Sequence, residues 1–153
     1  MSIEGQKIYP GEDATALQVL GLADEYKRAA ETLLPMGRRR KPLSRAPYRL
    51  LAIQAIELYL NALLLSRGLT SAKIRGLQHD MAARARFARD NGLVLRRATV
   101  LHLNELSRSR EYLISRYGPD MNSSLSQLNR LWATLKEVSE KVAKIMGEKA
   151  ATK

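Results

Sequence analysis

Three polar side chains, Gln54, Glu57 and Asn61, interrupt an apolar stretch that runs from Ser44 to Gly68 of the 153-residue chain. Their spacing places them in one narrow stripe along a helix. A carboxylate between two amides offers both hydrogen-bond acceptors and donors. The stripe is therefore either a filled polar core or the lining of an open groove, and we favour the core.

Two further polar groups could contact a ligand. His79 and Asp80 precede a predicted helix, where Asp80 would accept hydrogen bonds from backbone N–H groups as an N-cap. We favour this capping role over a ligand-contacting one. Tyr112, Arg116 and Tyr117 stand near the end of a later helix, where a cation is favourable beside the helix dipole.

The positive charge of the chain is concentrated in its middle. Residues 38–97 hold fourteen Lys and Arg against three acids, which accounts for the whole net charge of +11. Such a segment predicts an electropositive surface and a phosphate-bearing partner. The alternative, that Arg-rich helices are simply well solvated, has equal weight. The predicted RNA or nucleotide contacts are Arg38, Arg39, Arg40, Arg45, Arg49, Arg84 and Arg86.

Composition excludes several kinds of site. The chain has no Cys and only two His, which rules out disulfides, thiolate chemistry and zinc sites built on Cys. No Gly-rich phosphate loop is present, and we expect no cofactor and no metal. The N-terminus lacks the pattern of a signal peptide, and no uncharged apolar run reaches the roughly 18 residues of a membrane span. We expect a cytoplasmic protein of bacterial type.

Helical spacing of apolar residues, with no strand-like alternation, predicts an all-α fold. Short connections favour an up-and-down antiparallel bundle of about five helices. The expected helices cover about residues 13–34, 44–68, 80–91, 96–117 and 122–146. The second, with Ser44 as its N-cap, is apolar on nearly every side and must be surrounded by protein. We expect a single domain over residues 1–153, in which 12–35 and 122–147 are helices outside a core of 45–120.

Residues 45–120 resemble the HEPN domain (higher eukaryotes and prokaryotes nucleotide-binding). The resemblance rests on RAPYRLLAIQAIELYLNALLLSRG, on HDM before a short helix with NGL after it, and on EYLISRYGPD. The matching positions are Ala55, Glu57, Leu58, Gly68, His79, Asp80, Met81, Tyr112, Arg116 and Tyr117. The chain departs from the pattern at Asn61, where relatives have Lys, and at Gly118, which is inserted before the expected Pro.

The resemblance implies a helical domain that binds RNA or a nucleotide and forms a homodimer. It also implies that Glu57 faces the helix carrying Arg116, so that the two pair across the bundle. A nucleotidyltransferase-type protein is one candidate partner for such a domain.

Ribonucleases of this family have an Arg followed, after four to six residues, by a His. Arg97-ATVL-His102 is similar in spacing, although the residue after the Arg is Ala98 rather than a polar one. The match implies a metal-independent endoribonuclease of the type found in toxin–antitoxin pairs, with Arg97 and His102 at the scissile phosphate.

The leading hypothesis is a HEPN-like helical module that binds RNA or a nucleotide through a basic surface. The endoribonuclease and a purely structural dimerisation protein are the alternatives. A DNA-binding regulator is weaker, because no helix-turn-helix pair emerges.

Overall fold

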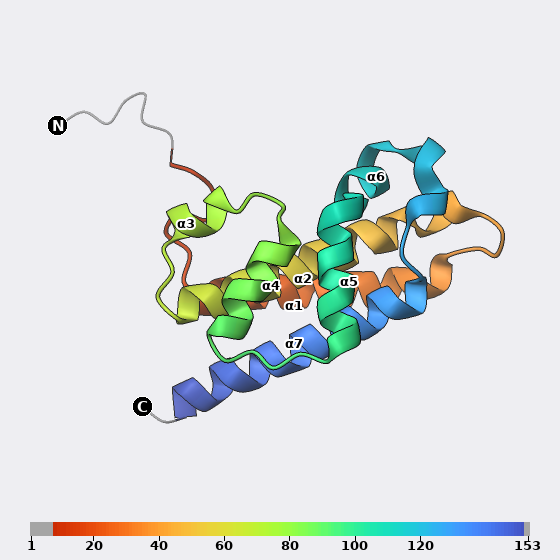
Figure 1. Cartoon of the computed structure of the whole chain (residues 1–153). Helices are drawn as coiled ribbons and strands as arrows, with labels where there is room; N and C mark the ends of the chain where they lie inside the picture. The colour runs from red at the N-terminus through yellow and green to blue at the C-terminus, as the bar shows by residue number, and fades with distance from the viewer. Residues whose placement is uncertain (1–7, 152–153) are drawn as a thin grey trace.

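Helices make up most of the chain, as their apolar spacing predicts (Figure 1). The computed structural model describes residues 8–151, apart from the side chains of 122–124 and 149–151. The α-helices in this range are α1 (Ala16–Leu33), α2 (Ala46–Ser66), α3 (Ser71–Gly76), α4 (Met81–Asp90), α5 (Arg97–Ser109), α6 (Glu111–Tyr117) and α7 (Leu128–Ala151). Three short 3₁₀ helices are η1 (Leu34–Met36), η2 (Pro42–Arg45) and η3 (Pro119–Ser124). The prediction of an all-α helical bundle is confirmed.

The apolar helix α2 lies at the centre of the bundle. It packs against α1, α4, α6 and α7, and Leu60, Leu63 and Leu64 are fully buried. With η2, over Pro42–Ser66, it is long and apolar enough by composition to cross a membrane, but 61% of its 18-residue apolar window is buried inside the bundle. Its many apolar sides are thus covered by protein.

Helices α1 and α2 form an antiparallel hairpin (Figure 1). A capping box begins α1, in which the Thr15 hydroxyl accepts from the Gln18 N–H while the Gln18 side chain accepts from the Thr15 N–H. This cap sets the start of the helix at Ala16, three residues later than expected. The hydroxyl of Tyr59 on α2 donates to Asp24 of α1 at 2.5 Å and joins the pair.

Ser44 does not cap α2 as expected, because it orders the turn before the helix. Its hydroxyl accepts from the N–H of Arg38 at 2.7 Å and donates to the carbonyl of Lys41 at 2.6 Å. Helix α2 begins two residues later, at Ala46, with Pro47 in its first turn.

The helix expected over 96–117 is broken at Arg110, which has φ +54°. The break lets Glu111 turn inward, where it is fully buried and accepts from Arg49 and from the Ser126 N–H. In Figure 1, α5 runs transverse to the α1–α2 hairpin, and α6 continues in a new direction after the break. Because η3 occupies 119–124, the last helix begins at Leu128 rather than near residue 122.

The Asp80 cap is confirmed. Its carboxylate accepts from the Ala83 N–H at 3.0 Å and begins α4. The helix ends at Asn91 and Gly92, and Gly92 has φ +102°. Residues 1–7 of the expected leader lie outside the described part of the chain.

Candidate functional site

A groove of about 770 Å³ lies between α1, α2 and α3. Its size falls within the range of small-molecule sites, about 300 to 1,000 Å³. Apolar walls are formed by Val19, Leu22, Leu58, Leu65 and Ile74. Polar side chains reach it from Gln18, Glu57, Asn61, Gln78, His79 and Arg84, and Tyr9 and Arg75 also line it.

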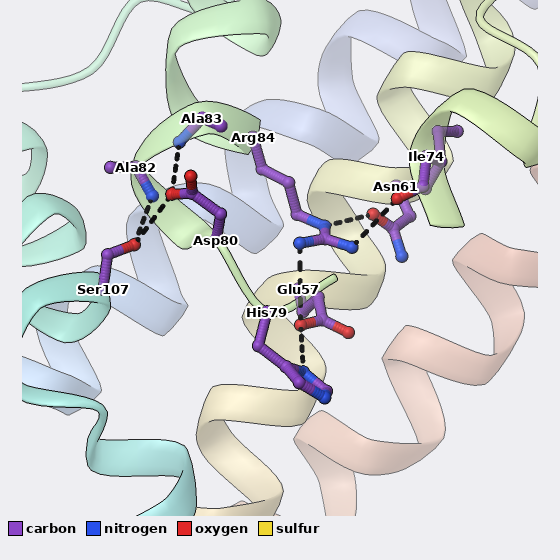
Figure 2. Close-up of polar contacts among 9 residues, drawn as sticks. All are labelled: Glu57, Asn61, Ile74, His79, Asp80, Ala82, Ala83, Arg84 and Ser107. Carbon is purple, nitrogen blue, oxygen red and sulfur yellow. Dashed lines mark hydrogen bonds and ion pairs between the residues drawn. The ribbon is translucent and has the colours of Figure 1, made fainter. Parts of the chain in front are cut away.

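Arg84 of α4 is buried against the polar stripe of α2 (Figure 2). Its Nε donates to Asn61 Oδ1 at 2.7 Å, its Nη2 donates to the Ile74 carbonyl at 3.3 Å, and its Nη1 lies 3.8 Å from Glu57 Oε1. Burial lowers the pKa of Arg84, while Glu57 and Asp80 oppose that shift. With 3% exposure, Arg84 cannot be the surface phosphate contact that we expected, and that prediction is wrong.

Glu57 uses one carboxylate oxygen for its contacts with both His79 and Arg84. Its Oε1 lies 3.3 Å from His79 Nδ1 as well as facing Arg84. Figure 2 shows the other oxygen, Oε2, directed away from both side chains and towards α1. Glu57 therefore retains a hydrogen-bond acceptor on the groove side.

The amide of Asn61 has a defined orientation. A guanidinium only donates, so the oxygen of Asn61 must face Arg84 and the NH₂ group must face away from it (Figure 2). Asn61 is one helical turn beyond Glu57 on the same face of α2. The groove is thus lined by an acceptor and a donor, side by side.

The loop between α3 and α4 is fixed to α5. Asp80 accepts from the Ser107 hydroxyl at 3.2 Å, and the same hydroxyl accepts from the Ala82 N–H at 2.7 Å (Figure 2). The His79 ring lies 4.4 Å from the ring of Tyr112 on α6. These contacts hold the His79 imidazole beside Glu57.

Sequence reasoning missed the residues at the rim of the groove. The guanidinium of Arg75 lies over the ring of Tyr9, 4.4 Å from its centre. Ser71 donates to the Glu12 carbonyl at 2.7 Å, which fixes α3 to the segment before α1. The dipeptide Tyr9-Pro10 and an isolated Arg75 gave no motif that could have identified this wall.

The expected pair between Glu57 and Arg116 is wrong. Arg116 is exposed on α6 and lines a separate hollow with Leu43, whereas Glu57 pairs with His79 and Arg84. Gln54, the third member of the stripe, is half-buried and lies outside the groove lining.

A buried Arg–Glu pair does cross the bundle, between Arg49 and Glu111. The Nη1 of Arg49 donates to Glu111 Oε2 at 3.1 Å and to the Ser126 carbonyl at 2.6 Å. Arg49 is 9% exposed, so its predicted role as a surface phosphate contact is also wrong.

The other predicted phosphate contacts do not form one surface. Arg38, Arg39 and Arg40 are exposed and Arg45 is half-buried, all in the connection between α1 and α2. Arg86 is exposed on α4, far from that connection (Figure 1). The predicted phosphate contacts are thus divided between two regions of the surface and the interior.

The structure does not bring Arg97 and His102 together. Arg97 is exposed at the start of α5, while His102 is 5% exposed and its Nδ1 lies 2.6 Å from Thr134 Oγ1. Burial lowers the pKa of His102 to about 4, and Arg130 adds to the shift. A scissile phosphate cannot reach this imidazole in the observed conformation.

Tyr112 and Tyr117 have different environments. Tyr112 packs against His79 beside the groove, while Tyr117 is 75% exposed at the end of α6.

Across the described residues, no three His, Asp or Glu side chains gather as a metal site. Comparison with protein-family models, curated proteins and solved structures finds no match to this chain.

Proposed function

We propose that the protein binds a nucleotide in the groove beside α2. The observation that carries this proposal is the acceptor and donor pair, Glu57 Oε2 and Asn61 Nδ2, which face away from Arg84 on two side chains that line the groove. The edge of a nucleobase presents donors and acceptors side by side, and an amide or a carboxylate is a common partner for such an edge.

The walls of the groove suit a planar ring. Val19 and Leu22 come from α1, and Leu58 and Leu65 come from α2, so apolar side chains from two helices line the space. A nucleobase between them would bury its faces while its edge meets Glu57 and Asn61. A volume of about 770 Å³ favours a mononucleotide over a longer strand.

The rim supplies a cation for a phosphate. Arg75 is exposed, and its contact with Tyr9 holds the guanidinium at the groove. A guanidinium can donate two parallel hydrogen bonds to a phosphate group. Deeper in the groove, Arg84 balances the charge of Glu57, so a neutral base does not meet an uncompensated carboxylate.

The polar groups are held in place before any ligand binds. Arg84 fixes the amide of Asn61 and His79 contacts the carboxylate of Glu57, so little side-chain freedom is lost on binding. Nucleotide binding is also what the resemblance to HEPN domains implies. Glu57 and His79, two of the positions that carry that resemblance, line the groove.

Isothermal titration calorimetry with AMP, GMP, CMP and UMP tests the proposal, with ribose 5-phosphate as the control ligand. We expect saturable binding at one site per chain, with a preference among the four bases. The Arg75→Gln variant should bind about tenfold more weakly, since a charge-assisted hydrogen bond contributes about 1.5–3 kcal/mol. Arg89→Gln, which removes an exposed charge of α4 outside the groove lining, should not change affinity.

Absence of binding by all four nucleotides would refute the proposal. So would ribose 5-phosphate binding as tightly as the nucleotides, because the base would then contribute nothing.

A further inference from the structure

A second surface lies at the opposite end of the α1–α2 hairpin from the groove (Figure 1). We call it the basic end. Its exposed cations are Arg38, Arg39, Arg40, Lys41 and Arg116. Its exposed apolar side chains are Met36 (66%), Leu43 (55%), Tyr117 (75%) and Met121 (45%). Asp120 is the one acid in the segments 34–46 and 116–121.

Three segments of the chain meet to build the basic end. η2 contacts both η1 and η3, so residues 34–36 and 119–124 both lie next to it. Leu43 of η2 and Arg116 of α6 line the same hollow of about 210 Å³, together with Pro119. The cations and the exposed apolar side chains therefore come from segments that lie next to one another at this end of the bundle.

The turn that carries most of the cations is ordered. Arg38 and Lys41 form an antiparallel bridge, and the Ser44 hydroxyl contacts the backbone of both. Arg40 has φ +62°, which gives the tight turn its shape. The charges are thus displayed on a fixed loop.

The combination of cations with exposed aliphatic side chains fits a lipid surface. Arg and Lys are attracted to anionic headgroups, and a Tyr such as Tyr117 suits the headgroup level. Met36, Leu43 and Met121 can insert among acyl chains. A single-stranded nucleic acid would instead need aromatic faces for its bases, and Tyr117 is the one aromatic side chain of this surface. We propose that the basic end docks the protein onto an anionic lipid bilayer.

Vesicle co-sedimentation of the full chain tests the charge contribution. We expect binding to vesicles of equimolar phosphatidylcholine and phosphatidylglycerol, and little binding to phosphatidylcholine alone. Arg39→Gln with Lys41→Gln should weaken binding about twenty-five-fold, since each cation near an anionic surface contributes about fivefold. The control pair Arg89→Gln with Arg97→Gln removes two exposed charges elsewhere and should have a much smaller effect.

Substitutions of the apolar side chains distinguish a lipid bilayer from other anionic partners. Met36→Gln with Leu43→Gln keeps every charge and should reduce vesicle binding about tenfold or more, because two apolar side chains no longer leave water. Val94→Gln with Leu101→Gln alters two exposed apolar residues elsewhere and should leave binding unchanged.

Equal binding to the two kinds of vesicle would overturn the proposal, as would an apolar pair of substitutions with no effect. A labelled single-stranded RNA provides the competing result. The basic end is a nucleic-acid surface if the protein binds this RNA but not the vesicles. In that case the Arg39/Lys41 variant should bind RNA more weakly, and the Met36/Leu43 variant should bind it as the unmodified protein does. Nucleotide binding in the groove is independent of all these variants.

Discussion

Arg84 donates from Nε to Asn61 Oδ1 at 2.7 Å, and this hydrogen bond determines which end of the Asn61 amide faces the groove. The same guanidinium stands 3.8 Å from Glu57. One buried cation on α4 thus holds two neighbouring polar side chains of α2 and sets the pattern of donor and acceptor that a ligand meets.

Loss of Arg84 should destabilise the fold. The Arg84→Met variant keeps most of the side-chain volume but removes the guanidinium beside Glu57, which then keeps its contact with His79. Removal of one partner from a buried pair costs about 3–5 kcal/mol, and we expect the lower end because Glu57 retains some exposure. Urea unfolding measures the change, with Arg89→Met as the exposed control on the same helix. Equal stabilities for the two variants would contradict the buried role of Arg84.

The pair of Arg49 and Glu111 should show strong energetic coupling. Arg49→Met or Glu111→Gln alone is expected to cost about 3 kcal/mol, since each leaves a buried polar partner without its hydrogen bond. The double variant should lose clearly less folding stability than the sum of the losses in the two single variants. A double-mutant cycle from urea unfolding tests this, and strictly additive losses would count against a direct interaction.

Acid should destabilise the protein through His102. The pKa of this group is 6.5 in its ordinary state and about 4 in the fold, so between these values the unfolded chain binds more protons and stability falls as the pH falls. From pH 7 to pH 5 the free energy of unfolding should decrease by about 2 kcal/mol because of this group. The His102→Asn variant should show a flatter pH dependence, and His79 remains in both proteins as an internal control. An unchanged slope would contradict a buried, neutral His102.

Much of the fold follows from local sequence signals. The uniform apolarity of α2 predicts a central helix. Asp80 predicts the start of α4 because an Asp side chain is a favoured N-cap. The break at Arg110 could not be predicted, because Arg has no preference for a positive φ. It depends on the pairing of Glu111 with Arg49, 62 residues earlier in the chain.

The site was harder to predict than the helices. The polar stripe identifies Glu57 and Asn61. No signal in the sequence distinguishes their partner Arg84 from the other cations of the basic segment. Arg84 and Arg86 are two positions apart on α4 and cannot share a face, so one is buried while the other is exposed. Which one turns inward depends on the polar groups that α2 presents.

The most direct test of nucleotide binding is the calorimetric affinity of Asn61→Asp. The new carboxylate can still accept from Arg84, but it replaces the NH₂ donor on the groove side with an acceptor. We predict that the preferred nucleotide binds at least about tenfold more weakly, with little change in melting temperature. Gln54→Glu, the same change at the position of the stripe outside the groove lining, should bind as the unmodified protein does. Unchanged affinity in a folded Asn61→Asp variant would contradict the proposed site.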